Sequence, residues 1–320
     1  MTTGSCQALE RLVGMSSAIR GLHAFIPKVA ARNCNVLITG ETGTGKERVA
    51  EAIHSNSSRS NRDFVCVNCA AVPDALLESE LFGYEKGAFT GAYSRFRGRL
   101  QEAEGGTVFL DEIGDMSPVS QAKILRAIEQ KQIYKIGGRA PEPLDIRVIA
   151  ATNRDLRQMV ANQQFRSDLY YRLNVVNVHL PPLRERPEDV ALLFDYYMRE
   201  MSTGEVNAQA LTTEAMTLLM HYDWPGNIRE IRNLVELLLI EPARKLVSPE
   251  DLPSYMRCGN SMSQQCERER LIAVLGATLW NKSQAAKRLH CSRMTLYRKM
   301  IKYDLARSRP APKLHSSTPA

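Results

Sequence analysis

Short apolar runs alternate with amphipathic stretches from residue 10 to about residue 180. The runs are rich in β-branched residues, as expected of buried strands, and the apolar positions between them recur at helical spacing. The predicted strands cover residues 35–39, 64–67, 107–110, 147–151 and 175–180. Strands that alternate with helices favour a parallel sheet with crossover helices, so we predict an α/β fold for this part of the chain.

A different pattern begins after Pro181 and Pro182, which end the alternation. From residue 187 to about residue 240, apolar residues such as Val190 and Leu193 recur at helical spacing. This stretch is therefore predicted to be all-helical.

The rest of the chain divides into three parts. Proline, glycine and serine concentrate between residues 242 and 265, which predicts a linker. A compact helical unit is expected at about 267–305, followed by a proline-containing tail that we expect to be disordered.

Bulk composition narrows the class of protein. The 44% hydrophobic and 24% charged content is typical of a globular protein. No apolar run approaches the roughly 20 residues of a membrane helix, and the first residues lack a signal-peptide pattern, so a cytoplasmic protein is expected. The seven cysteines are scattered, and Cys66 and Cys69 lie in or beside a predicted strand without a second pair at zinc spacing, which disfavours a redox or zinc role.

Positive charge is concentrated at the carboxyl end of the chain. Residues 266–320 contain 12 Lys and Arg against 3 Asp and Glu, a balance of +9, whereas the other residues contain 30 against 32. Such local charge is expected where a protein binds a phosphate backbone, although a solvated basic tail would look the same.

A phosphate-binding loop follows the first predicted strand directly. Residues 40–46 read GETGTGK and precede a helical stretch, which is the context of a Walker A loop. Its backbone N–H groups and the start of the helix would bind the phosphates of ATP, and Lys46 would reach the β- and γ-phosphates. Glu47 stands where most such loops have a Ser or Thr hydroxyl on Mg²⁺, so the metal must be held elsewhere.

Two carboxylates end a later predicted strand, in the sequence GGTVFLDE at residues 105–112. This is a Walker B pattern, in which Asp111 would hold Mg²⁺ and Glu112 would orient and polarise the attacking water. We assign to the nucleotide site Gly40, Glu41, Thr42, Gly43, Thr44, Gly45, Lys46, Glu47, Gly105, Gly106, Asp111 and Glu112.

The sequence between these motifs resembles a known family. Residues 87–92 read GAFTGA, which resembles the signature of bacterial enhancer-binding proteins, the AAA+ activators of sigma-54 RNA polymerase. The likeness runs from Leu12 to about Leu305 and includes Glu47, which matches the usual GE-x-GTGKE form of this family. It implies an α/β AAA+ P-loop ATPase with a parallel sheet and a helical lid subdomain, followed by an all-α Fis-type helix-turn-helix domain. The expected domains are a short N-terminal extension at 1–11, the α/β subdomain at 12–180, the lid at 181–241, the linker at 242–265, the helix-turn-helix domain at 266–306 and the tail at 307–320.

Further site residues follow from this resemblance, one position at a time. Asn68 matches a switch asparagine that engages the catalytic glutamate, here Glu112, and Asn153 matches sensor I. Arg166 and Arg172 lie in a segment similar to the one that supplies arginine fingers across a subunit interface, and Arg229 matches sensor II. The sigma-54 contact is expected at Gly87, Ala88, Phe89, Thr90, Gly91 and Ala92.

The basic carboxyl end resembles the Fis-type helix-turn-helix that closes this family. A short helix with small residues on one face is predicted at 283–289, and Ser292 is a plausible N-cap for a recognition helix at 293–300. Trp280 and His290 depart from the family pattern, which usually has glycine at both positions. The DNA contacts are expected at Ser283, Ser292, Arg293, Thr295, Tyr297, Arg298 and Lys299.

The implied partners are sigma-54 RNA polymerase holoenzyme and enhancer DNA, without a membrane. The resemblance also implies a homo-oligomer, a hexamer in this family, and leaves open a mixed ring with a paralogue. Only about ten residues precede Leu12, as in the receiver-less members similar to the phage-shock and hypersensitive-response activators, so we expect a regulatory protein that acts in trans.

Two other classes of protein share part of these features. An AAA+ protein remodeller or unfoldase would have the nucleotide site but needs no DNA reader. A DNA-binding regulator with a vestigial ATPase would not need the complete set of Lys46, Glu112 and the paired arginines. An activator whose ATPase remodels the sigma-54 holoenzyme into an open complex accounts for all the motifs together.

Overall fold

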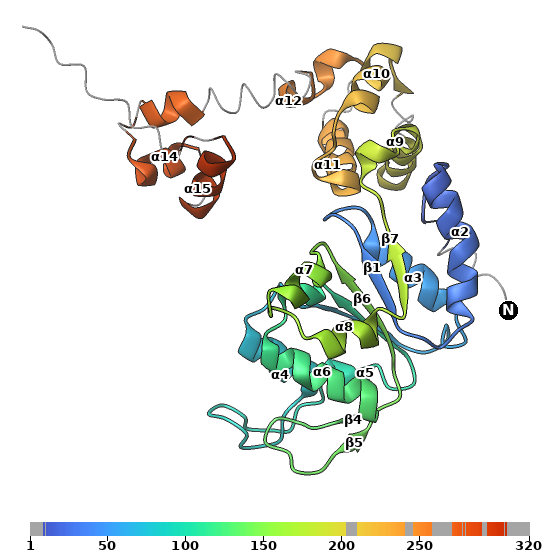
Figure 1. Cartoon of the computed structure of the whole chain (residues 1–320). Helices are drawn as coiled ribbons and strands as arrows, with labels where there is room; N and C mark the ends of the chain where they lie inside the picture. Colours follow the sequence, from blue (N-terminus) through green and yellow to red (C-terminus); the bar gives the residue numbers. More distant parts are fainter. Residues whose placement is uncertain are drawn as a thin grey trace, which may run out of the picture. The chain divides into compact units, whose positions relative to one another are not determined.

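The computed structural model describes residues 9, 11–202, 210–240, 246–257, 271–276, 278, 280–289, 293–303 and 305. The chain divides into two compact units, Met1–Ser248 and Pro249–Ala320. The first unit contains an α/β subdomain and a helical lid, and the second contains short helices (Figure 1).

A five-stranded parallel sheet forms the centre of the α/β subdomain, in the order β2-β3-β6-β1-β7. The strands are β1 (Val36–Thr39), β2 (Phe64–Asn68), β3 (Thr107–Asp111), β6 (Arg147–Thr152) and β7 (Val176–His179). All five predicted strands are confirmed, and each of their ends lies within one residue of the prediction. The nearly continuous burial of the inner strands β1, β3 and β6 reflects a sheet that is covered on both faces.

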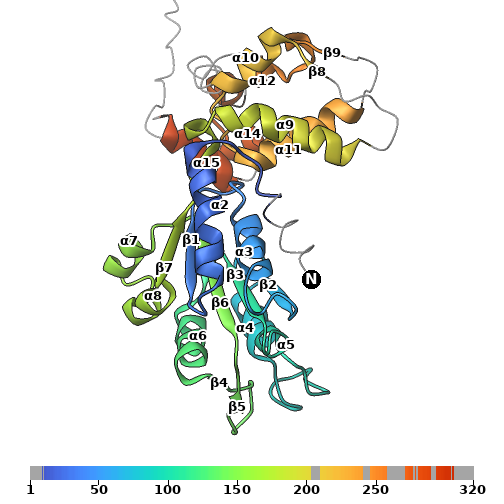
Figure 2. The same cartoon turned by 90° about the vertical axis from the view of Figure 1, so that its right-hand side faces the viewer.

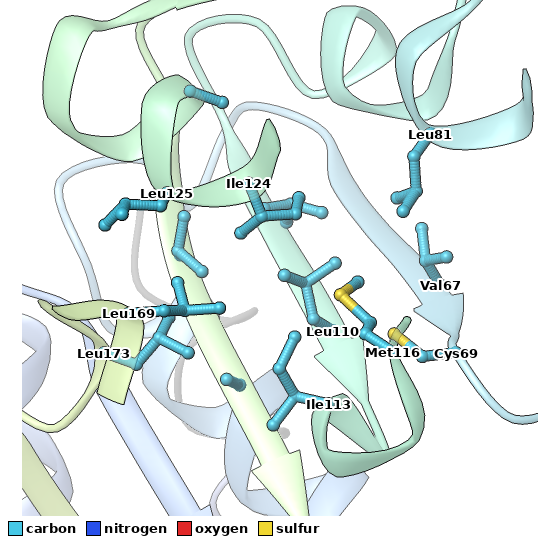
Figure 3. Close-up of a cluster of buried hydrophobic side chains, with 14 of the residues drawn as sticks. Val67, Cys69, Leu81, Leu110, Ile113, Met116, Ile124, Leu125, Leu169 and Leu173 are labelled. Carbon is cyan, nitrogen blue, oxygen red and sulfur yellow. The ribbon is translucent and has the colours of Figure 1, made fainter. Parts of the chain in front are cut away.

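Helices pack on both faces of this sheet (Figures 1 and 2). Side chains alternate between the faces: Leu37 points into one buried cluster, whereas Val36 and Ile38 point into the other. The second cluster contains α2 (Ser17–Ala30) and α3 (Lys46–Ser55). The first, part of which Figure 3 shows, contains α4 (Asp74–Phe82), α5 (Arg99–Glu102), α6 (Pro118–Gln130), α7 (Leu156–Ala161) and α8 (Ser167–Leu173).

The two ends of the sheet carry different structures. At the carboxyl ends of the strands lie the phosphate loop, the short helix η1 (Ile113–Asp115) and the lid. At the opposite end lie the loop of residues 83–98 and the hairpin of β4 (Gln132–Ile133) and β5 (Glu142–Pro143) (Figures 1 and 2).

The lid is helical, as predicted. It is joined to the sheet through η2 (Leu183–Glu185) and consists of α9 (Glu188–Met201), α10 (Thr213–His221) and α11 (Asn227–Ile240). A short parallel pair, β8 (Ala210–Leu211) with β9 (Leu246–Val247), was not predicted, because two residues are too few to show a strand period. Part of the segment expected to be a linker, residues 242–265, therefore has regular structure.

The second unit is a small all-helical body. Its elements are η3 (Pro249–Asp251), α12 (Ser254–Arg257), a helical stretch at residues 271–276, α14 (Lys282–Arg288) and α15 (Arg293–Lys302). Its core contains Leu271, Leu275, Ala285, Ala286, Leu296, Met300 and Leu305. The expected succession of an α/β subdomain, a helical lid and an all-α domain is confirmed. Within the described ranges, no helix is long and apolar enough to cross a membrane.

Candidate functional site

The phosphate loop turns sharply between β1 and α3. Gly43 and Gly45 have φ angles of +81° and +102°, which favour glycine, and a Cβ on Gly43 would lie 2.3 Å from the Gly226 carbonyl oxygen. The first helical residue is Lys46, and α3 begins without a side-chain cap. No described residue accepts a hydrogen bond from the backbone N–H groups of Gly43, Gly45 or Lys46. Free N–H groups at the start of a helix fit a phosphate anion.

A cavity of about 240 Å³ lies beside this loop. The phosphate loop and the acidic pair, Asp111 and Glu112, form part of its wall, and the lid closes it from another side. Besides these, its lining includes Glu47, Arg48, Tyr197, Ile228, Arg229 and Arg232. Arg229 was expected here; Arg232 was not, although its spacing of three residues from Arg229 places both on one helix face.

Lys46 is buried at this cavity. Its Nζ donates to the carbonyl oxygens of Gly40 at 3.0 Å and Glu41 at 3.2 Å, and lies 3.6 Å from Glu112 Oε1. The ammonium group is therefore held between the loop and the acidic pair.

The acidic pair lies at the carboxyl end of β3. Glu112 has a φ of +51°, an uncommon conformation for a residue other than glycine, and its Oε2 accepts a hydrogen bond from the Asn153 backbone N–H at 3.1 Å. Burial raises the pKa of Asp111, the charge of Glu112 raises it further, and Lys46 opposes both effects. Lys46 neutralises the charge of Asp111 only in part. Two adjacent carboxylates with remaining negative charge are suitable ligands for a divalent cation, so Asp111 and Glu112 suit Mg²⁺.

The two asparagines lie at the same end of the sheet. Asn153 follows β6, and its Nδ2 donates to Thr42 Oγ1 at 2.9 Å. Asn68 ends β2, paired in register with Asp111, and its Oδ1 accepts from the Ala70 N–H at 2.9 Å. In the described residues Asn68 makes no hydrogen bond with Glu112.

Gly105 and Gly106 require a correction. They precede the first residue of β3, whereas Asp111 is its last, so they lie at the opposite end of the strand from the phosphate loop. A Cβ on Gly106 would lie 2.2 Å from the Asp63 carbonyl oxygen. Close backbone packing therefore explains Gly106, and neither glycine is placed to bind a nucleotide.

Arg166 caps the start of α8, Arg172 lies in its last turn, and both are exposed. The Arg166 guanidinium makes two hydrogen bonds to the Asp168 carboxylate, at 3.0 and 2.7 Å. Neither arginine lines the cavity of its own chain.

The GAFTGA residues form a turn whose middle is exposed from Phe89 to Gly91, whereas Ala92 at its end is buried. Gly87 and Gly91 have φ angles of +83° and +107°, and a Cβ on either would meet nothing within 4 Å. Phe89 is 46% exposed, and its ring lies 4.9 Å from that of Tyr84 in an edge-on arrangement. The turn therefore presents an aromatic side chain at the surface.

A buried lysine connects this loop with the neighbouring hairpin. The side chain of Lys135 is 3% exposed, and its Nζ lies 2.7 Å from Glu142 Oε1 and 3.6 Å from Glu85 Oε1. Arg95 pairs with the same two carboxylates. Sequence reasoning missed this network, because its members are distant in the chain.

The second unit buries the side of α15 that was predicted to be buried. Leu296 and Met300 are in the core, whereas Arg293, Tyr297 and Arg298 are exposed. The other expected contacts, Thr295, Lys299 and Ser283, lie on α15 or α14, and Ser292 lies outside the described residues. Trp280 has a φ of +61°, a conformation that favours glycine, which explains why the family pattern usually has glycine at this position.

Family comparisons agree with this arrangement. A model described as the Sigma-54 interaction domain matches residues 12–179, more than half of the chain. The chain belongs to the sigma-54-dependent transcriptional activators. The AAA+ ATPase lid domain matches residues 184–269, and the Fis family of bacterial regulatory proteins matches residues 264–303. The expected family and fold class are thus confirmed, and members of this family are ATPases.

Individual relatives are similar over most of the chain. The transcriptional regulatory protein ZraR of Klebsiella oxytoca is 46% identical over 301 residues, which cover 90% of this chain and 68% of ZraR. The Nif-specific regulatory protein of Klebsiella pneumoniae is 43% identical, with 92% of this chain and 59% of that protein covered. A crystal structure of NtrX from Brucella abortus in complex with ADP matches with a TM-score of 0.70 and 36% identity, over 91% of this chain and 68% of that one.

Proposed function

We propose that this activator binds DNA upstream of a promoter and hydrolyses ATP to remodel sigma-54 RNA polymerase holoenzyme into an open complex. The observation that carries the proposal is the pairing of two sites in one subdomain. A phosphate loop with a carboxylate pair lies at one end of the sheet, and an exposed GAFTGA turn lies at the other.

The residues of the phosphate site have separate roles in this proposal. The loop N–H groups and Lys46 bind the phosphates, and Arg229 contacts the nucleotide from the lid. Asp111 would hold Mg²⁺, which neutralises phosphate charge when it is bound. Glu112 orients and polarises the attacking water, and Asn153 holds the Glu112 carboxylate through its backbone N–H. A related solved structure, that of NtrX, is described in complex with ATP, which supports ATP as the nucleotide.

The chain segments that follow Asn68 and Glu112 lead to the opposite end of the sheet. After Asn68 the chain runs through α4 to the loop of residues 83–98, and after Glu112 it runs through α6 to β4. A change at the carboxylate pair on hydrolysis therefore has two helices through which it can displace the GAFTGA turn, whose Phe89 and Thr90 would contact sigma-54.

Hydrolysis in this proposal requires assembly. Arg166 and Arg172 are exposed and absent from the cavity of their own chain, as expected of fingers that reach a neighbouring subunit. A homo-oligomer, of which the hexamer is the expected form, would place them there. Arginine fingers contribute about 10³–10⁵ in rate in related phosphoryl-transfer enzymes, so hydrolysis should rise with protein concentration.

The second unit would hold the activator on DNA. The exposed Arg293, Tyr297 and Arg298 on α15 are suited to base and phosphate contacts in the major groove. The +9 charge of residues 266–320 favours the phosphate backbone.

The direct test is open-complex formation on a sigma-54 promoter with the purified full chain and the sigma-54 holoenzyme. We expect strand opening with ATP and Mg²⁺, and none with a non-hydrolysable ATP analogue. Opening that proceeds equally without hydrolysis, or that also occurs with a holoenzyme lacking sigma-54, would contradict the proposal.

A further inference from the structure

The outer side of the phosphate loop is hydrogen-bonded to the lid. Three successive loop carbonyl oxygens each accept a hydrogen bond from a donor at residues 181–241. Thr42 O accepts from Asn227 Nδ2 at 3.1 Å, and Gly43 O accepts from the Ile228 N–H at 2.9 Å. Thr44 O accepts from Arg186 Nη2 at 3.1 Å.

The two side-chain donors are held in place by their own surroundings. Asn227 is 0% exposed and has a φ of +52°, and its Oδ1 accepts from the Leu183 N–H at 2.8 Å, which orients the amide toward the loop. Arg186 is 1% exposed and lies 3.9 Å from the buried carboxylate of Asp189. That carboxylate accepts from the backbone N–H groups of Met15 and Ser16. Burying these polar groups is costly unless they are hydrogen-bonded, so their contacts with the loop contribute to a specific arrangement.

An ion pair at the surface joins the same two parts. Arg184 Nη2 lies 2.6 Å from Glu41 Oε1, and Arg184 Nη1 lies 2.9 Å from Glu41 Oε2. Asn227 Nδ2 also reaches Glu41 Oε2, at 3.3 Å. The hydrogen bonds from Arg184 lower the pKa of Glu41, so this carboxylate is ionised at neutral pH. Both side chains are partly exposed, which makes the pair accessible to mutation without opening the core.

These hydrogen bonds reach the loop from its carbonyl side, and this direction determines how they affect the loop N–H groups. The carbonyl oxygen and the N–H of one peptide unit point in opposite directions, so the donors on the Thr42 and Thr44 carbonyl oxygens hold the N–H groups of Gly43 and Gly45 on the opposite side, toward the cavity that both glycines line. The Thr44 N–H, opposite the Gly43 carbonyl, donates within the loop to the Glu41 carbonyl oxygen at 3.4 Å. A loop held in its binding conformation loses less conformational entropy when the phosphate binds.

We propose that the lid sets the nucleotide affinity of the phosphate loop from its carbonyl side, with Arg184, Arg186 and Asn227 as positioning residues. This contribution is separate from the contact that Arg229 makes inside the cavity. A rotation of the lid would change the loop even where Arg229 stays on the nucleotide. The inference rests on the proposed ATPase function and names a determinant of its affinity.

The test measures nucleotide affinity with a fluorescent mant-ADP probe and ATP hydrolysis with the full chain. Glu41→Ala and Arg184→Ala should each raise the Kd for mant-ADP and the KM for ATP by about three-fold, as expected for loss of one partly exposed pair. Because the loop is held equally in the ground state and the transition state, kcat should stay within about two-fold. Asn227→Ala, which removes the donor to the Thr42 carbonyl oxygen and the acceptor of the Leu183 N–H, should raise the Kd by about ten-fold.

Two further variants separate positioning from general stability. The double variant E41A/R184A should bind no more weakly than either single variant, and the charge swap E41R/R184E should recover most of the affinity. Arg99→Ala, which breaks an exposed ion pair with Glu102 away from the loop, should leave the Kd unchanged. Thermal melts by circular dichroism show whether each variant is folded.

Unchanged affinity in both exposed single variants, or additive losses in the double variant, would overturn the inference. A merely structural pair would lower the melting temperature and leave the Kd as in the wild type. A wild-type protein that binds mant-ADP but hydrolyses no ATP would contradict the proposed function alone, because the binding arm would still test the carbonyl-side contacts.

Discussion

The two ends of the α/β subdomain use glycine for different physical reasons. In the phosphate loop, a Cβ on Gly43 would lie 2.3 Å from a lid carbonyl oxygen, so this glycine is required by close contact. In the GAFTGA turn, Gly87 and Gly91 have open space around them, and only their positive φ angles call for glycine. One loop is thus enclosed by a second subdomain, and the other projects from the surface.

Polar and aromatic groups show the same difference. At the phosphate site, Lys46 and Glu112 are each hydrogen-bonded or ion-paired, and lid donors occupy three loop carbonyls. At the opposite end, Phe89 is 46% exposed and Tyr93 is 87% exposed. Aromatic residues are enriched in protein–protein interfaces relative to the rest of the surface. In the proposed function, the enclosed end binds the nucleotide and the exposed end contacts the polymerase.

Glu112→Gln disables the enclosed end and should have the largest effect. The glutamine keeps the shape of the side chain but cannot act as a base, so ATP hydrolysis should fall by about 10²–10⁴-fold. Binding of mant-ADP should stay close to that of the wild type, and Glu188→Gln on the surface of the lid is the matched control. Hydrolysis at the wild-type rate would remove Glu112 from the proposed role.

Lys135→Met tests whether the exposed end needs its ion pairs. Without Lys135 the carboxylates of Glu85 and Glu142 lose their buried cation and keep Arg95, with Gln101 as a further donor to Glu142, so the loop should lose its fixed position against the hairpin. We expect open-complex formation to fall by about ten-fold, with ATP hydrolysis within about two-fold of the wild type. Lys28→Met, at an exposed position on α2, should change neither rate. An equal loss of hydrolysis and opening would show that the two ends are not separable in this way.

Asp111→Asn has a smaller effect, and its sign depends on pH. The folded protein raises the pKa of Asp111, so protonation stabilises the fold below the ordinary carboxyl pKa, and this stability is lost as the pH rises through the raised value. At neutral pH the ionised side chain is therefore unfavourable, and Asp111→Asn should raise the melting temperature without nucleotide by about 1–3 °C. The gain should be smaller at about pH 4.5, because Asp111 is then more protonated in the folded wild type. Thermal melts at both pH values test this expectation, with Asp195→Asn at an exposed position as the control. A lower melting temperature of Asp111→Asn at neutral pH would contradict the account.

Much of the fold and site was predictable from the sequence, for identifiable reasons. The inner strands β1, β3 and β6 are buried apolar runs, and the edge strands β2 and β7 are rich in valine, so all five were found. Lys46, Asp111 and Asn153 lie beside strand ends, where parallel strands bring distant residues together. Gly105 and Gly106 were assigned to the wrong end of β3, because a motif read as one string does not show which end of the strand each residue occupies.

What the sequence did not show depends on contacts between distant segments. The donors on the carbonyl side of the loop come from 142 to 185 residues further along the chain, and no local period links them to it. The same holds for Lys135, whose burial arises from a loop and a hairpin that meet only in the folded protein. The usual glycine at Trp280 was noted from the family pattern, but its cause, a φ of +61°, became visible only in the structure.

Thr90→Ala tests most directly whether hydrolysis at one end serves contact at the other. The substitution removes one exposed hydroxyl and methyl group from the GAFTGA turn and leaves the phosphate site untouched. ATP hydrolysis and open-complex formation should be measured on the same preparation with the sigma-54 holoenzyme. The account predicts hydrolysis within about two-fold of the wild type and no detectable open complex, because the substitution removes a contact with the polymerase and leaves the phosphate site unchanged. Full opening by Thr90→Ala would contradict the account, because the turn would then not transmit the hydrolysis cycle to the polymerase.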